Sequence, residues 1–303
     1  MKAVSSTKSG PPEVLKIIER DKPTPGPKEV LIKVHSASVT SGDINLRRIP
    51  RLLQSVLGPI AGFKPMKTPG VEYAGTVEAV GSDVTAFKAG DPVCGTTTGL
   101  AHGANAEFVC VPEKPKIGVI ALKPENVSFG EAAAATVGPM TAMFLLKKAG
   151  IASGQRVLVY GASGSVGTYA VQLAKHFGAE VTGVCSGANI SLVQSLGADH
   201  MIDYQKEDFT QNSQQYDLVF DAVGKISKSR CAGSLSENGR FATVRSMTKE
   251  NSDELRNILR LVEAGVVKAV IDRDYSLDEI VEAHRYVESG RKRGNVILRV
   301  ADE

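Results

Sequence analysis

Short apolar runs and helical periodicities alternate through the middle of the chain. The runs are rich in β-branched residues and have the length of buried strands. They fall at residues 155–159, 179–185, 200–204, 217–221 and 240–244. Between them, helices are predicted for residues 165–177, 189–196 and 225–235. This alternation predicts an α/β fold with a Rossmann-type, doubly wound parallel sheet, which binds a dinucleotide beyond the carboxyl ends of its strands.

The first of these strands leads into a glycine-rich turn. Residues 160–167 read Tyr-Gly-Ala-Ser-Gly-Ser-Val-Gly, and the predicted helix begins within this segment. A helix N-terminus presents free backbone N–H groups, and glycine lets the backbone approach a diphosphate closely. The turn therefore predicts a dinucleotide site, with a tight turn that holds no ligand as the alternative.

The first 120 residues follow a different pattern. Apolar and polar side chains alternate over residues 29–38, as in a half-buried strand, and further short strands are predicted at residues 73–80, 92–94 and 106–111. Glycine and proline separate these strands, which is typical of an irregular, mostly β barrel or sandwich.

The last part of the chain returns to a mixed pattern. A helix is predicted for residues 252–264, and Ser276 with Glu279 forms a capping box that opens another helix, which extends to about residue 289. A strand at residues 295–300 follows, and we expect it to return to the first domain.

Composition narrows the classes of function. The 303 residues are 42% hydrophobic and carry a net charge of +3, which suits roughly two domains with sizeable cores and argues against a nucleic-acid partner. Residues 291–293 are the densest basic run and are interpreted as a solvated loop. No run of eighteen apolar residues appears, so no membrane span is expected. Four cysteines lie far apart without a pairing pattern, which favours a reducing, cytoplasmic location.

Several motifs resemble those of a known enzyme family. They lie at residues 69–77, 87–93, 161–167, 196–204, 270–284 and 294–296. Together they resemble the zinc-independent quinone oxidoreductase branch of the medium-chain dehydrogenase/reductase superfamily. The resemblance implies a chaperonin-10-like (GroES-like), mostly β catalytic domain over residues 1–122 and 267–303. It also implies a Rossmann domain over residues 123–266, with the nicotinamide in the cleft between the domains.

The zinc-binding residues of the wider superfamily are missing. Thr40 to Asp43 contain no thiol, and Val71 stands where zinc-dependent relatives carry a ligand histidine. The five histidines are scattered, so no cluster supplies the three or four ligands that zinc needs. Without a Lewis acid, reduction of an electrophilic acceptor is easier than oxidation of an alcohol. We therefore expect hydride transfer to a quinone or another α,β-unsaturated carbonyl compound, without zinc.

The resemblance places residues 39–47 at the nicotinamide end of the site. Thr40, Asp43 and Arg47 are the candidate catalytic residues, although many relatives carry Asn where Thr40 stands. Asp43 and Arg47 are four residues apart, so an ion pair that fixes the loop is the alternative. The apolar stretch at residues 44–63 is expected to form either a wall of the acceptor pocket or a packed helix.

The candidate cofactor residues follow from the resemblance and from the glycine-rich turn. They are Thr141, Ser163, Gly164, Ser165, Val166, Gly167, Ser186, Tyr204, Val223 and Val244. For Thr141 a helix-cap role is the alternative, and for Tyr204 an ordinary place at a strand end. No acid follows the second strand, which admits a 2′-phosphate, but Ala188 stands where similar proteins carry a cation. NADPH is therefore expected as the cofactor, with NADH as the alternative.

The chain departs from the family after Ser246. Residues 247–251 leave no room for the helix and sixth strand that relatives carry there, and in relatives this strand commonly pairs across a dimer axis. Either the sheet has five strands and the homo-oligomer associates differently, or the sequence omits part of the natural chain. Two functional alternatives stay open: a 2-alkenal or enone reductase with little quinone activity, and a non-enzymatic nucleotide-binding regulatory or structural protein.

Overall fold

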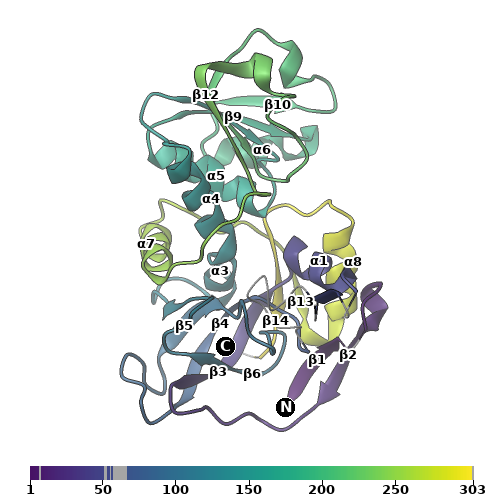
Figure 1. Ribbon diagram of the computed structural model, residues 1–303, viewed down its shortest axis with the longest axis vertical. Helices are drawn as coiled ribbons and strands as arrows, with labels where there is room; N and C mark the ends of the chain where they lie inside the picture. The colour runs from purple at the N-terminus through teal and green to yellow at the C-terminus, as the bar shows by residue number, and fades with distance from the viewer. Residues whose placement is uncertain (7, 51–52, 55, 57–66, 302–303) are drawn as a thin grey trace. The chain divides into compact units, whose positions relative to one another are not determined.

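The chain forms two compact units, shown in Figure 1. The computed structural model describes residues 1–6, 8–50, 53–54, 56 and 67–301. Unit 1 comprises Met1–Val137, Glu250–Glu263 and Ile271–Glu303, and unit 2 comprises Gly138–Lys249 and Ala264–Val270. Residues 123–137 and 250–263, which the sequence assigned to the Rossmann domain, therefore belong to the compact unit of the β domain.

Unit 2 contains a parallel sheet of five strands in the order β10-β9-β8-β11-β12. Its strands are β8 (Arg156–Tyr160), β9 (Glu180–Cys185), β10 (His200–Asp203), β11 (Tyr216–Asp221) and β12 (Leu235–Thr243). The sheet interior is apolar, with Leu158, Val219 and Phe220 fully or almost fully buried. The doubly wound parallel sheet predicted from the sequence is confirmed. In the described residues it has five strands, which both alternatives for the segment after Ser246 allow.

Two of the three predicted helices connect these strands, and a further helix precedes β8. They are α4 (Val137–Lys148), α5 (Ser165–His176) and α6 (Ile190–Ser195), with the 3-10 turns η2 (Gly187–Asn189) and η3 (Phe209–Gln211). The helix predicted at residues 225–235 is wrong, because this crossover consists of turns and the short η4 (Ala232–Ser234). The buried Asp221 carboxylate accepts hydrogen bonds from the backbone N–H groups of residues 223–226, which draws this segment into a turn around it.

Unit 1 is built on a seven-stranded sheet and a two-stranded one. The larger sheet has the order β13-β14-β3-β4-β5-β7, with β6 also paired to β3, and β1 pairs with β2. The strands are β1 (Lys2–Ser6), β2 (Leu15–Glu19), β3 (Glu29–Ser38), β4 (Glu72–Val80), β5 (Pro92–Thr96), β6 (Phe108–Pro112), β7 (Ile120–Leu122), β13 (Ile271–Ser276) and β14 (Asn295–Arg299). β14 runs antiparallel to β3 with Ile297 opposite Ser38, which confirms that the last strand returns to the first domain.

The helices of unit 1 cover the edges and one end of this sheet (Figure 1). They are α1 (Ser41–Arg48), α3 (Phe129–Ala134), α7 (Ser252–Glu263) and α8 (Ile280–Glu288), with the 3-10 turns η1 (Pro12–Val14) and η5 (Leu277–Glu279). Ser276 and Glu279 form the predicted capping box. The helix α7 buries Leu255, Ile258 and Leu259 and packs against β7. The short link after Ser246 therefore leads into a helix that belongs to unit 1.

One stretch bears on the expectation that the chain has no membrane span. Residues 129–148 are long and apolar enough to cross a membrane by length and composition, and 67% of the stretch is buried within the fold. The stretch is interrupted at Ala135 and Thr136, where α3 ends and α4 begins. Burial and the break are the features of core helices, and length with composition is weak evidence for a span.

Candidate functional site

The glycine-rich turn of unit 2 has the geometry of an anion site. Gly161 has a φ of +79°, and a side chain there would meet Val223 at 2.6 Å. A Cβ on Gly167 would lie 2.1 Å from the carbonyl oxygen of Gly161, so only glycine lets α5 pack onto the turn. At Gly164, by contrast, a Cβ would meet nothing closer than the same oxygen at 3.5 Å. Gly164 is also the N-cap of α5 and provides no side-chain cap, which leaves the helix N-terminus open to an anion.

The structure brings the predicted residues around this turn together. Ser163 accepts a hydrogen bond of 3.1 Å from Asn189 Nδ2, which ties the turn to the segment after β9. Ser186 is the first residue of that segment. Tyr204 N donates to the carbonyl oxygen of Cys185, which directly precedes Ser186, so the exposed Tyr204 lies beside the start of the segment. Val223 covers Gly161, and Val244 N donates to the Asp221 carbonyl oxygen at the end of β11. Thr141 is the fifth residue of α4, so the alternative of a helix cap is wrong for it.

Two polar residues of this site were missed by the sequence analysis. Asn189 Nδ2 donates a hydrogen bond to the Ser163 hydroxyl, as described above. Asp203 ends β10 opposite Cys185, is buried, and would lie 2.6 Å from a Cβ on Gly187. An acid therefore does stand beside the segment after the second strand, but it comes from the neighbouring strand. The Ile202-Asp203-Tyr204 motif carried this signal, because parallel strands bring their carboxyl ends to one edge of the sheet.

In unit 1, Thr40 and Asp43 form a closed local motif. Thr40 is the N-cap of α1, and its N–H and hydroxyl both donate to Asp43 Oδ2, at 2.8 and 2.6 Å. Asp43 N donates back to the Thr40 hydroxyl at 3.2 Å. Burial raises the pKa of the Asp43 carboxyl, against the lowering effect of these hydrogen bonds. This motif fixes the start of α1, and a direct role of Thr40 or Asp43 toward a ligand stays a prediction.

The ion pair between Asp43 and Arg47, which was the alternative to a contact with a ligand, is wrong. Arg47 is 5% exposed and pairs instead with Glu288 of α8, at 2.8 Å. Its Nε donates to the Gly10 carbonyl oxygen at 3.0 Å, and its Nη1 donates to His284 Nδ1 at 3.0 Å. Burial and the Arg47 charge lower the pKa of His284 to about 3, so the ring is neutral and accepts this bond. With all three guanidinium nitrogens bound internally, Arg47 joins α1 to α8, and its expected contact with a ligand has no support in this geometry.

A buried acidic site near the start of β4 was not predicted. Glu72 is 2% exposed and accepts hydrogen bonds from the Ser38 hydroxyl, the Thr136 hydroxyl and Val137 N. Burial raises the pKa of its carboxyl to about 7, although these hydrogen bonds lower it. The sequence feature that could have indicated this site is a glutamate at the first position of an otherwise apolar strand. Its hydrogen-bond partners, however, lie 34 and 65 residues away along the chain.

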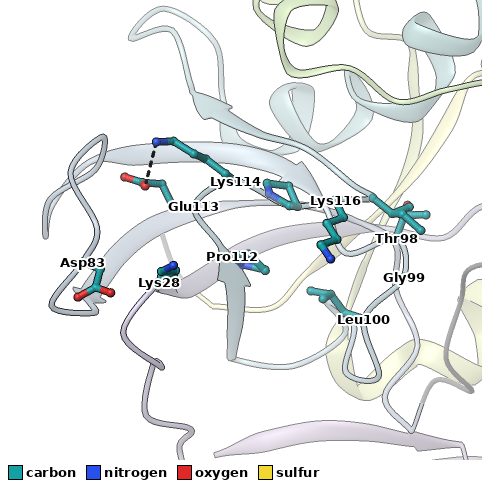
Figure 2. Close-up of a pocket in the computed structure, with 11 residues that line it drawn as sticks. Lys28, Asp83, Thr98, Gly99, Leu100, Pro112, Glu113, Lys114 and Lys116 are labelled. Atoms are coloured by element: carbon teal, nitrogen blue, oxygen red, sulfur yellow. Dashed lines mark ion pairs between the residues drawn. The ribbon is translucent and has the colours of Figure 1, made fainter.

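Unit 1 also contains a separate pocket of about 540 Å³, which Figure 2 shows in close-up. Lys28, Lys114 and Lys116 line it together with Glu113. Lys114 lies 3.8 Å from the Glu113 carboxylate, which also accepts hydrogen bonds from Thr85 N and Ala86 N. None of the predicted site residues lines this pocket, so it is distinct from the site described above.

The potential metal ligands are scattered over the described part of the chain. No group of three or more His, Cys, Asp or Glu side chains there is placed to hold a metal ion. Two of the histidines have other roles, since His284 accepts from Arg47 and the His35 ring lies 4.4 Å from that of Phe129. Half of the stretch at residues 44–63, in which the acceptor-pocket wall or a packed helix was expected, lies outside the described residues, and its first part, residues 44–48, belongs to α1.

Comparison with known proteins shows which family the chain resembles. Residues 26–124 match the family model of the alcohol dehydrogenase GroES-like domain, and residues 165–281 match that of the zinc-binding dehydrogenases. The chain is 38% identical to 2-methylene-furan-3-one reductase of Solanum lycopersicum, covering 98% of this chain and 79% of the relative. It is 33% identical to the chloroplastic NADPH-dependent alkenal/one oxidoreductase of Arabidopsis thaliana, with the same coverage. The quinone oxidoreductase structure from Coxiella burnetii superposes with a TM-score of 0.88 at 30% identity, over 99% of each chain.

Proposed function

Because the chain belongs to the medium-chain dehydrogenase/reductase superfamily, in its quinone oxidoreductase-like branch, we propose that it reduces quinones or other α,β-unsaturated carbonyl compounds with NADPH. It is an NAD(P)H-dependent oxidoreductase, which leaves the non-enzymatic alternative without support. The single observation that carries the proposal is the open, uncapped N-terminus of α5 at Gly164. A turn that holds no ligand does not explain why the space beside Gly164 is open while Gly161 and Gly167 are in close contact with their neighbours.

The residues of unit 2 fit a nicotinamide dinucleotide. The N–H groups at the start of α5 would hold the diphosphate, which the helix dipole favours. Ser186, Asn189 and Tyr204 would surround the adenosine ribose, and Val223 would shield the turn from water. The bound nicotinamide supplies a hydride, and the protein positions the acceptor and provides the proton.

The preference for NADPH is proposed to be modest. The relative named NADPH-dependent supports it, as does the absence of an acid in the segment 186–189 itself. The buried Asp203 carboxylate beside Gly187 works against a 2′-phosphate, because two negative charges would approach each other. Ala188 offers no cation to offset that repulsion.

The chemistry is proposed to need no zinc, because Val71 supplies no ligand and the segment 40–43 contains no thiol. A reducing, cytoplasmic location remains part of the proposal. The four cysteines are free, and burial raises their thiol pKa values to about 11 or about 12. Such thiols are protonated and poorly reactive.

The names of two relatives favour a second candidate, a 2-alkenal or enone reductase with little quinone activity. The test is an acceptor screen that follows oxidation of NADPH and NADH with 9,10-phenanthrenequinone and with acrolein. Turnover of both acceptors supports the first proposal, and turnover of acrolein alone supports the second. Oxidation of neither nicotinamide by any quinone or enone would contradict both.

A further inference from the structure

The separate pocket of unit 1 has the size and lining of a small-molecule site. Its volume of about 540 Å³ lies within the range of roughly 300–1,000 Å³ that is typical of pockets that hold small molecules. The residues that line it come from the start of β3, from the loops after β4 and β5, and from the segment between β6 and β7. Three lysines lie there together with apolar side chains, among them Leu100 and Ile117.

Hydrogen bonds within unit 1 fix the walls of this pocket. Glu113 N donates to the Lys28 carbonyl oxygen at 3.0 Å, which joins the end of β6 to the start of β3. The Thr98 hydroxyl donates to Glu250 Oε1 at 2.7 Å, which holds the loop after β5. The pocket is therefore formed before any ligand enters it, and binding does not have to order its walls.

The acids that line the pocket have partners of their own. Glu113 accepts hydrogen bonds from Ala86 N and Thr85 N, which hold the pKa of its carboxyl below the ordinary value. Lys114 points toward this carboxylate and lies 3.8 Å from it (Figure 2). The second acid, Asp83, accepts a hydrogen bond of 2.9 Å from the Ser82 hydroxyl. Lys114 and Glu113 therefore balance each other, and two lysines of the pocket remain.

These two lysines, Lys28 and Lys116, differ in their surroundings. Both are exposed, and among the described residues neither forms an ion pair. In Figure 2, Lys28 and the acids Asp83 and Glu113 lie on one side of the pocket, and Lys116 lies on the other side and extends toward Leu100. Lys116 is therefore a cation without a nearby acid from the pocket lining, and it stands beside apolar side chains.

We propose that this pocket binds a small organic anion, a molecule that joins a carboxylate or phosphate group to an apolar ring or chain. Lys116 holds the anionic group, and Leu100 and Ile117, whose side chain is 43% exposed, contact the apolar part. A lysine ammonium is a point charge without the planar fork of arginine, so it accepts either anionic group. The inference does not depend on the proposed function, because none of the predicted site residues lines this pocket.

The test is a fluorescence titration of the full chain with 8-anilinonaphthalene-1-sulfonate, a dye that joins an anionic sulfonate to aromatic rings. Saturating NADP⁺ keeps the dye out of the dinucleotide site. N-phenyl-1-naphthylamine, the same molecule without the sulfonate, is the neutral control, and we expect it to bind more weakly than the dye. Equal or tighter binding of the neutral compound would show that the pocket does not select an anion.

Three lysine variants separate the pocket from the rest of the surface. Lys116→Gln should raise the Kd of the dye about fivefold, as loss of an exposed charge pair does. Lys28→Gln should raise it only about twofold, because Asp83 lies on the same side of the pocket and repels an anion there. Lys16→Gln removes an exposed lysine from β2 and should leave the Kd unchanged. An unchanged Kd in Lys116→Gln, or an equal rise in Lys16→Gln, would overturn the inference.

Two further measurements locate the dye and identify the anionic group. In amide NMR spectra, the dye should shift the signals of Gly99 and Lys116, which line the pocket, and shifts confined to residues elsewhere would contradict the site. 1-Naphthoate and 1-naphthyl phosphate should displace the dye, and the one that does so at the lower concentration identifies the preferred group. The neutral 1-naphthol should not displace it. Failure of both anions to displace the dye would overturn the inference and would leave the proposed function untouched.

Discussion

Substitution of Gly164 separates the folding role of the glycine-rich turn from its binding role. Gly164 has a φ of −82° and a ψ of 174°, an extended conformation that any residue adopts, and a Cβ there meets only the Gly161 carbonyl oxygen at 3.5 Å. Gly164→Asp should therefore fold. It should even stabilise the protein by about 0.5 kcal/mol, because aspartate at an N-cap bonds the first N–H groups of α5 and complements its dipole.

The same substitution should remove cofactor binding. The new carboxylate would occupy the space that a diphosphate needs and would repel it. For two charges about 5 Å apart at an effective dielectric constant of about 20, the repulsion is about 3 kcal/mol. This corresponds to a rise in the Kd of NADPH on the order of 100-fold. Gly164→Asn is the matched control, because asparagine caps the helix equally well without the charge, and we expect it to raise the Kd by only about tenfold.

The assay is a fluorescence titration with NADPH on each variant, together with denaturant unfolding. Gly167→Ala provides the contrast, because its Cβ would lie 2.1 Å from a backbone oxygen and should destabilise unit 2 itself. An unchanged Kd in a folded Gly164→Asp protein would refute the assignment of the diphosphate to this helix. A large loss of stability in that variant would refute the open geometry on which the argument rests.

The remaining predictions concern pH, cofactor choice, metal and chain length. Glu72 has a folded pKa of about 7 against an ordinary value of 4.5, so its protonation stabilises the fold below pH 4.5 and this contribution is lost as pH rises to about 7. At about 1.4 kcal/mol per unit of pKa, the free energy of unfolding of the wild type relative to Glu72→Gln should fall by about 3 kcal/mol over that interval, and a constant difference would contradict the buried, near-neutral carboxyl. Ala188→Arg should tighten NADPH about tenfold and leave NADH nearly unchanged, and a ratio of the two Kd values that does not move would show that this segment does not face the 2′-phosphate. Dialysis against a chelator should leave activity unchanged, whereas loss of a stoichiometric metal together with activity would show zinc dependence. A proteolytic peptide of the natural protein that contains both Ser246 and Met247 should have the mass that the sequence gives, and a larger mass would mean that residues between them are missing from the sequence.

The sequence predicted the elements that depend on local pattern. β3 was located at its observed bounds, Glu29–Ser38, because ten residues of alternation carry the period of a strand. The helix predicted at residues 225–235 is wrong, because turns and the short η4 occupy this crossover and the nearby Asp221 carboxylate holds the N–H groups of residues 224 and 225 in a turn, which the pattern of apolar residues does not reveal. The same limit applies to the site. The glycine-rich turn is contiguous in sequence and was found, whereas the partner of Arg47 proved to be Glu288, 241 residues away, where spacing had suggested Asp43.

The valine at position 71 connects the proposed zinc-free chemistry with the unusual state of Glu72. In a metal site, the bound cation is the largest local charge and holds nearby acids in their ionised form. In the described part of the chain, the buried Glu72 carboxyl beside Val71 accepts three hydrogen bonds. Those interactions are too weak to offset desolvation completely, so its pKa rises to about 7. A reductase that has no metal to stabilise the developing negative charge on its acceptor needs a proton for that purpose. In the proposed zinc-free chemistry a proton therefore takes the place of the Lewis acid, and the raised pKa of Glu72 accompanies the valine that stands in place of the ligand histidine.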